Sequence, residues 1–174
     1  MVVLHCTQKL LKELGKPPLC NLVNSSSNDL ESWYANLLRF HRKKCILFTN
    51  EKTLYSFLVP NILRADLKEI QTLFFTNLRS NLDYEGFPPD VINQVISKHQ
   101  DLCFAKTSNR SVIGSMLDFD FQYYFDIATM NDFNNILDIN YKINRMPMSY
   151  IKYMYPIEAL SHTLVSNNNE AQFK

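Results

Sequence analysis

The sequence predicts a single α+β domain, in which a small mixed or antiparallel sheet packs against several helices from the C-terminal half. Three observations favour this fold class. Strand-like apolar runs are concentrated before residue 60, helical periodicity dominates after residue 65, and the 174 residues show no internal repeat or domain boundary. A chain of this length with 46% hydrophobic residues can bury one core. We therefore expect one domain over residues 1–165 and a flexible tail over residues 166–174.

The expected sheet combines an N-terminal strand with a hairpin. Residues 2–6 (VVLHC) form a short apolar run. Two longer apolar runs, residues 33–40 and 45–49, flank a basic cluster, which is the pattern of a β-hairpin. Residues 54–59 fit an edge strand that ends at a proline, because proline has no N–H to give to a neighbouring strand. Residues 102–106 are expected to form one more strand.

The expected helices follow from capping residues and from a period near 3.6. Thr7 can cap a first helix, which Gly15 ends and the two prolines after it prevent from resuming. Residues 19–29, rich in Asn and Ser, are expected to form a surface loop. The other predicted helices cover residues 65–82, 88–98, 111–127, 132–144 and 156–165.

Composition and charge exclude several classes of protein. The hydrophobic and charged fractions (46% and 20%) are those of a folded soluble chain rather than a disordered one. No apolar run approaches the roughly 18 residues that span a bilayer, and the first residues lack the features of a signal peptide. We therefore expect no membrane partner. The net charge of +1 is uneven, because residues 1–80 carry 11 basic and 6 acidic side chains (+5) and residues 81–174 carry 7 and 11 (−4).

The four cysteines are expected to be reduced. Cys6, Cys20, Cys45 and Cys103 contain no CxxC spacing, and three of them lie in strand-like apolar runs where cysteine acts as a small hydrophobe. The four histidines are too dispersed to suggest a metal centre. We therefore expect a cytoplasmic protein with no metal and no cofactor.

The segment TSNRSVIGSMLDF, residues 107–119, is the main candidate for a site. If Ser111 caps a helix, then Ser111, Ser115, Asp118, Gln122 and Asp126 form one polar stripe at spacings of four, three, four and four. The simpler interpretation is the solvated face of a core helix. The alternative is a cradle for an anion, built from Asn109, Arg110 and the free N–H groups of the first turn.

A second candidate is the basic cluster between the two hairpin strands. Arg42, Lys43 and Lys44 could contact the phosphates of a nucleic acid. A charged hairpin turn is more often simply solvated, and both interpretations remain open at this stage.

Three motifs resemble a family of small bacterial proteins that is known only as a domain of unknown function. The first is CTQKLLKEL at residues 6–14, and the second is WYANLL at residues 33–38 followed by LFTNE at residues 47–51. The third and most specific is NRSVIGSMLDF at residues 109–119, which departs from the family pattern at Leu117, where an asparagine is expected. The resemblance covers nearly the whole chain and implies a shared fold and shared motif positions, but no reaction.

Because the family pattern keeps polar residues at 109, 110, 111, 115 and 118, the resemblance favours a site there. The first hypothesis is a binding or interaction module for an anionic ligand, a nucleic acid or a protein, with Asn109, Arg110, Ser111, Ser115 and Asp118 as ligand-binding residues. The alternative is a hydrolase or nuclease-like enzyme that uses Asp118 and Glu51 with Arg110. No nucleophile–base arrangement supports the enzyme. Carboxylates of Glu51 and Asp118 within about 5 Å of each other in a cleft would favour it.

Overall fold

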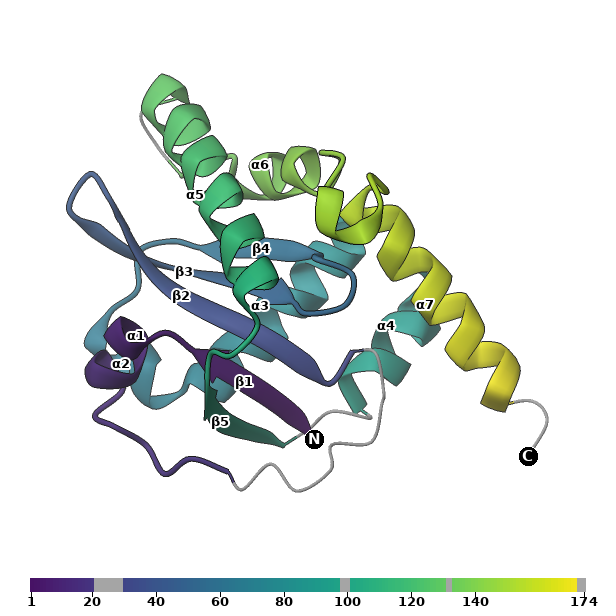
Figure 1. The fold of residues 1–174 in the computed structure, drawn as a ribbon, viewed down its shortest axis with the longest axis horizontal. Helices are drawn as coiled ribbons and strands as arrows, with labels where there is room; N and C mark the ends of the chain where they lie inside the picture. Colours follow the sequence, from purple (N-terminus) through teal and green to yellow (C-terminus); the bar gives the residue numbers. More distant parts are fainter. Residues whose placement is uncertain (21–29, 98–100, 131–132, 172–174) are drawn as a thin grey trace.

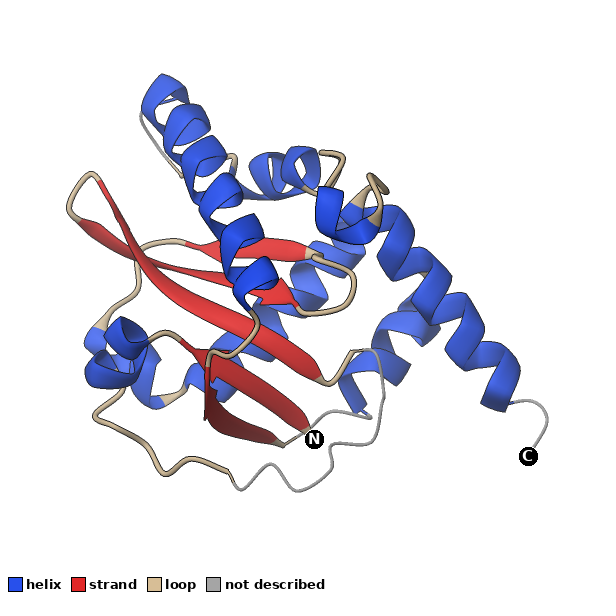
Figure 2. Ribbon diagram, viewed as in Figure 1, coloured by secondary structure: helices blue, strands red, loops and turns tan. Residues whose placement is uncertain are grey.

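A computed structural model of the chain describes residues 1–20, 30–97, 101–130 and 133–171. Its centre is a five-stranded sheet with helices against both faces (Figure 1, Figure 2). The strands are β1 (Val2–Cys6), β2 (Ser32–Phe40), β3 (Lys43–Asn50), β4 (Ser56–Val59) and β5 (Leu102–Lys106). The helices are α1 (Gln8–Glu13), α2 (Arg64–Lys68), α3 (Ile70–Tyr84), α4 (Pro89–Ser97), α5 (Arg110–Met130), α6 (Ile136–Ile143) and α7 (Pro156–Ala171), with a 3-10 helix η1 (Ser149–Ile151).

The strand order β4-β3-β2-β1-β5 makes the sheet mixed and confirms the predicted α+β class. β1 runs parallel to both of its neighbours, with Val3 opposite Ser32 in β2 and Cys103 in β5. β2 and β3 form the predicted antiparallel hairpin, and β4 pairs antiparallel with β3 at the edge of the sheet. The sheet therefore brings the start of β2, the end of β3 and the start of β1 close to one another.

One face of the sheet, which we call the aromatic face, packs against α1, α2, α3, α4 and α7 through apolar side chains. Alternation along β2 directs Trp33 to this face, where its ring contacts Phe57 and Phe74 at centroid distances of 5.8 and 5.2 Å. Phe48 lies 5.2 Å from both of those rings. All four side chains are almost fully buried, so this face is a continuous apolar core.

The opposite face, which we call the α5 face, is covered by α5, α6 and η1. Here Tyr34, Leu38 and Phe40 of β2 meet Val112, Met116, Phe119 and Tyr123 of α5. Figure 1 shows α5 crossing in front of the sheet as the outermost element of this face, and its C-terminal end extends past the strands. The core on this side is smaller and contains more polar atoms.

Asn140 of α6 and Asn144, which caps the C-terminus of that helix, close the edge of β4. Asn144 accepts the backbone N–H of Ser56 (2.8 Å) and donates to its carbonyl (2.7 Å). Asn140 makes the same pair of bonds to Leu58, at 3.0 and 3.4 Å. Because the two residues are four apart on a helix, their amides meet alternate residues of a strand. They occupy backbone groups that would otherwise leave the edge open to another chain.

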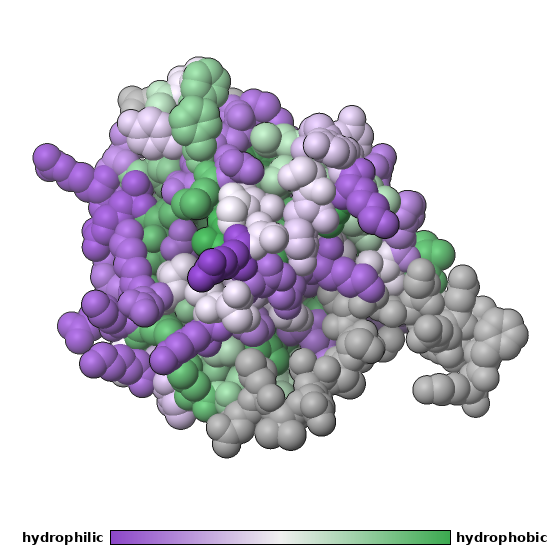
Figure 3. Space-filling view, in the orientation of Figure 1, coloured by the Kyte–Doolittle hydropathy of each residue, from purple (hydrophilic) through white to green (hydrophobic). Residues whose placement is uncertain are grey.

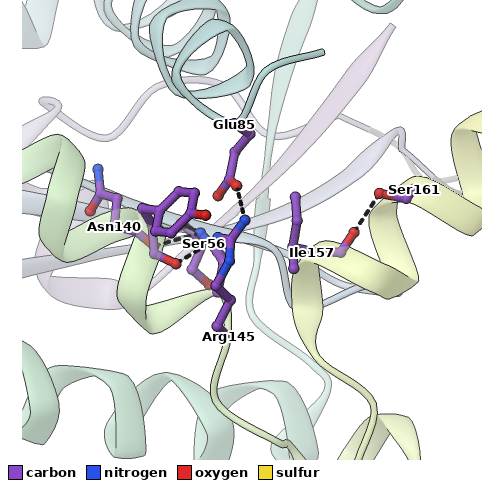
Figure 4. A network of polar contacts seen from close by, with 8 residues as sticks. Ser56, Glu85, Asn140, Arg145, Ile157 and Ser161 are labelled. Carbon is purple, nitrogen blue, oxygen red and sulfur yellow. Dashed lines mark hydrogen bonds and ion pairs between the residues drawn. The ribbon is translucent and has the colours of Figure 1, made fainter.

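A partly buried ion pair joins the segments that directly follow α3 and α6. Arg145 Nη2 lies 2.8 Å from a carboxylate oxygen of Glu85, whose side chain is 2% exposed (Figure 4). The Arg145 guanidinium also stacks on the Tyr141 ring, 3.3 Å from its centroid. Burial raises the pKa of Glu85, and the neighbouring guanidinium opposes that rise.

Several predicted helix boundaries are wrong. The single helix expected over residues 65–82 is two helices, because Glu69 leaves the helical region at φ −112° and ψ 34°. The break lets Leu67 and Ile70 both reach the core. α6 begins at Ile136, since Phe133 and Ile136 close a turn before it (3.2 Å); residue 132 lies outside the described residues, as do residues 21–29 of the expected loop. α7 continues six residues past 165, and the flexibility expected of residues 166–174 stays a prediction.

Candidate functional site

The start of α5 is tied to the sheet by side chains that surround the carboxylate of Glu51. Glu51 follows β3 directly and accepts hydrogen bonds from the hydroxyls of Ser32 and Tyr34, the latter at 3.4 Å. It also accepts a bond from the side-chain amide of Asn109 at 3.1 Å. Tyr34 Oη in turn accepts the backbone N–H of Asn109 at 2.9 Å. The residue before α5 is therefore held by both β2 and the end of β3.

Asn109, not Ser111, is the cap of α5. Its Oδ1 accepts the backbone N–H groups of Ser111 (3.1 Å) and Val112 (3.4 Å), which is the geometry of an N-cap. Its Nδ2 donates to Tyr150 Oη of η1 at 3.1 Å as well as to Glu51. These two bonds occupy backbone N–H groups of the first turn, which the hypothesis of an anion cradle required to be free.

Local backbone geometry fixes the position of Glu51. The Asn50 side-chain oxygen accepts the N–H of Lys52 (3.2 Å) and both the N–H and the hydroxyl of Thr53 (3.0 Å each). This is an Asx turn, a conformation that asparagine favours strongly. The N–H of Glu51 also bonds to the Ser32 carbonyl at 2.9 Å, so the carboxylate leaves the sheet in one direction only.

His5 of β1 extends the network on its inner side. Its ring stacks on Tyr34 with centroids 4.8 Å apart and an interplanar angle of 15°. Its Nδ1 lies 3.1 Å from the Lys106 carbonyl, and only a nitrogen that carries a proton can donate to that oxygen. His5 is buried, so it supports the tyrosine rather than meeting solvent.

The predicted site residues divide into two sets. Asn109 belongs to the network, whereas Arg110 and Ser111 lie beside it, exposed. Ser115 is buried, and its hydroxyl donates to the Ser111 carbonyl at 3.1 Å within the helix. Asp118 is exposed two turns further along α5. The structure thus gathers the first three residues at one place and directs the other two elsewhere.

The predicted polar stripe does not form the solvated face of α5. Two of its members, Ser115 and Asp126, are buried, and Asp126 pairs with Lys142 Nζ at 2.7 Å. The exposed face instead carries four large side chains: Leu117, Phe121, Tyr124 and Phe125. α5 is apolar around most of its circumference, and packing against α6 and the sheet decides which side is buried.

The geometry required for the hydrolase or nuclease-like alternative is not present. Glu51 bonds to Asn109 at the helix cap, but Asp118 lies nine residues further on, roughly 13 Å along an α-helix at about 1.5 Å per residue. No hydrogen bond joins the two carboxylates in the part of the chain that the structure describes.

The basic hairpin residues do not share one surface. Only Arg42 lies in the turn, while Lys43 and Lys44 are consecutive in β3 and point to opposite faces of the sheet. Lys43 Nζ lies 5.3 Å above the Phe133 ring, and Lys44 Nζ pairs with Glu13 at 2.6 Å.

A basic hollow, which the sequence did not indicate, lies beside α1. It has a volume of about 840 Å³ and is open to solvent. Its lining includes four cationic side chains and one carboxylate, contributed by α1, α2 and β3: Lys9, Lys12, Lys44, Arg64 and Glu13.

The cysteines and histidines form no further chemical centre in the described ranges. All four thiols are free, and burial raises the pKa of Cys6 to about 12 and that of Cys45 to about 11. Such thiols are inert because they do not ionise near neutral pH. No group of three potential metal ligands occurs among the described residues. None of the helices in those residues is long and apolar enough to cross a membrane.

Sequence reasoning missed the partners of Asn109. Tyr34 and Tyr150 lie 75 and 41 positions from it in the chain, and Ser32, which is joined to it only through Glu51, is also distant in the chain. Glu51 was proposed as a functional residue, but with Asp118 as its partner. The family motifs around residues 33–38 and 47–51 were the available signal, since they contain both Tyr34 and Glu51.

Fold and site together define a small mixed-sheet α+β domain with a polar network where the N-terminus of its longest helix meets the sheet. A family model described as "Domain of unknown function (DUF6933)" matches residues 3–159. The chain belongs to this family. No curated protein and no solved structure matches it.

Proposed function

We propose that the chain is a binding module for an anionic ligand, with Arg110 as its principal contact. One observation carries the proposal. Arg110 is exposed and makes no ion pair or hydrogen bond within the described residues, although it follows directly after the cap that the Glu51 network holds in place. Its backbone is therefore fixed while its guanidinium is available, which lowers the entropy lost when a ligand binds.

The surroundings of Arg110 suit an anionic group. The hydroxyls of Ser108 and Ser111 are exposed beside it, and Tyr150 Oη is partly exposed across the network. Two amides of the first turn of α5 are already bonded to Asn109, so the ligand would be held mainly by the guanidinium and these hydroxyls. The positive end of the helix dipole adds to the attraction.

Binding is favoured over hydrolysis because the polar network is saturated. The Glu51 carboxylate accepts three side-chain donors and spans the gap between two strands and a helix. A carboxylate in that position stabilises a scaffold, and Asp118 is too far along α5 to work with it. We place the protein in the cytoplasm as part of the proposal, since its buried thiols suit a reducing compartment.

The test uses inorganic phosphate as the probe in isothermal titration calorimetry at low salt. We expect Arg110→Ala to weaken phosphate binding roughly ten- to a hundredfold, the loss of one hydrogen-bonded charge, without lowering the melting temperature. Arg42→Ala is the matched control, since that arginine is also exposed and unpaired within the described residues. Equal weakening by both variants, or no binding to the wild type, would contradict the proposal.

The basic hollow favours a second candidate function, the binding of a polyanion such as a nucleic acid. Of the predicted contacts Arg42, Lys43 and Lys44, only Lys44 lines the hollow, where it lies with Lys9, Lys12 and Arg64. The affinity for a single-stranded oligonucleotide is measured over a range of salt concentrations. Replacing Lys9, Lys12 and Arg64 by neutral residues should reduce the slope of log affinity against log salt concentration by about 2 to 3 units. Replacing Arg42, Lys43 and Lys44 by neutral residues should reduce that slope less. A larger reduction from the Arg42, Lys43 and Lys44 replacements would show that the nucleic acid contacts the hairpin instead.

A further inference from the structure

The exposed arc of α5 carries four large apolar side chains within residues 117–125. Its large side chains Leu117, Phe121, Tyr124 and Phe125 are 59%, 74%, 63% and 61% exposed. Monomeric soluble proteins seldom leave so many large apolar side chains together in water, and such patches usually mark an interface. In Figure 3 hydrophobic atoms follow the upper part of α5 on the face that is turned to the viewer.

The sequence of the arc repeats at alternating steps of three and four residues. Starting from Gly114, the repeat passes through Leu117, Phe121, Tyr124 and Ala128. This spacing averages 3.5 residues, which is the repeat of a helix that packs lengthwise against another helix. Within the described chain the Tyr124 ring lies 6.4 Å from the Phe40 ring of β2, whereas Leu117, Phe121 and Phe125 remain exposed, and α5 is the outermost element of its face (Figure 1).

We propose that the arc binds a second copy of this chain, with the two α5 helices antiparallel and crossing near Phe121. Reversal of the helix about Phe121 exchanges Leu117 with Phe125, and Gly114 with Ala128. Large side chains then meet large ones, while small residues meet at both ends and let the backbones approach. A surface that is complementary to its own reverse is what a two-fold interface requires.

Charge on the arc favours the antiparallel arrangement. Between Ser111 and Thr129 its exposed positions hold a single charged residue, Asp118. Reversal about Phe121 places Asp118 opposite Tyr124 of the partner copy, whose hydroxyl can donate to the carboxylate. A parallel pair would instead bring the two Asp118 carboxylates to the same level and repel.

The area is sufficient for a specific dimer. A large side chain of this kind buries roughly 150–250 Å² in full, so four that are about two-thirds exposed leave about 500 Å² in water per copy. Two copies together would bury about 1,000 Å² from these side chains alone, which reaches the lower bound for specific interfaces. Each copy keeps its Arg110 at the rim, eleven residues from the crossing point.

The oligomeric state of the full chain tests the proposal in sedimentation-velocity experiments over a range of concentrations. We expect the wild type to sediment at twice its 20.4 kDa mass and Phe121→Glu to sediment as a monomer. Leu63→Glu is the matched control, because Leu63, directly before α2, is 67% exposed and its replacement should leave the dimer intact. A monomeric wild type at the highest concentration, or a Phe121→Glu dimer, would overturn the proposal.

Cross-linking tests the orientation with less risk to folding. Phe121→Cys lies on the proposed two-fold axis and should cross-link to its own copy with a short bis-maleimide, whereas Leu117→Cys should not. A mixture of Leu117→Cys and Phe125→Cys should cross-link, because those positions face each other. Efficient self-linking of Leu117→Cys with none at position 121 would contradict the antiparallel register.

Discussion

The two faces of the sheet are built in different ways. On the aromatic face, Trp33, Phe48, Phe57 and Phe74 interlock with one another and leave almost nothing exposed. On the α5 face, helices are fastened through polar bonds such as those of Asn109 and Asn140, and the outer side of α5 stays open to water. The aromatic face therefore supplies close apolar packing, whereas the α5 face positions side chains that can contact a ligand or a partner.

Truncating the aromatic face should have the largest effect on stability. Phe74 is fully buried and contacts Trp33, Phe48 and Phe57, so Phe74→Ala should lower the free energy of unfolding by roughly 3–5 kcal/mol. Urea denaturation measures this difference. Tyr153→Ala, which removes an aromatic ring that is 74% exposed, should change it by less than about 0.5 kcal/mol. Similar losses in the free energy of unfolding for both variants would show that the aromatic core contributes no more than an exposed ring.

Removing a buried hydrogen-bonding side chain on the α5 face should lower the free energy of unfolding somewhat less. Asn140→Ala leaves the Leu58 N–H and the Tyr123 hydroxyl without the acceptor that they share in the core. We expect a loss of roughly 2–4 kcal/mol in the same denaturation experiment, since each unpaired buried group costs about 1–3 kcal/mol. Asn135→Ala is the control, because Asn135 is exposed at the start of α6. A loss below about 1 kcal/mol would mean that water replaces the asparagine at the sheet edge.

The smallest expected effect is the pH dependence from Glu85. Burial raises the pKa of this carboxyl in the folded protein above 4.5, so the folded state holds the proton more tightly than the unfolded chain. The contribution of Glu85 to stability is therefore fully present below about pH 4.5 and is lost as the pH rises through the folded pKa. Wild-type stability minus that of Glu85→Gln should fall from pH 4 to pH 7. A difference that rises with pH would show that Arg145 outweighs burial.

Much of the fold could be predicted from the sequence because strands carry a local signal. The hydrophobic runs that became β1, β2, β3 and β5 are each long enough to identify alone, and β2 shows how alternation assigns its side chains to the two faces. The break at Glu69 could not be predicted, since residues on either side of it keep a helical period. It depends on Leu67 and Ile70 both reaching a core that only the folded chain defines.

The candidate site could be predicted only in part, because its contacts are long-range. Arg110 and Asn109 were identified from the loop and from the family motif, and Glu51 from the second motif. Their arrangement depends on Tyr34 and on the pairing of β2 with β3, which no local pattern specifies. The exposed side of α5 was assigned wrongly for a related reason: Phe121 and Phe119 look alike in the sequence, and only packing distinguishes them.

The central claim is that the fixed start of α5 presents Arg110 to an anionic ligand. The most direct measurement is a phosphate titration of the ¹⁵N-labelled protein, followed by the chemical shifts of its backbone amides. The account predicts saturable shifts centred on Ser108, Arg110 and Ser111, which disappear in Arg110→Ala and persist in Arg42→Ala. Shifts centred on Lys9, Lys12 and Arg64, or none that saturate, would contradict it.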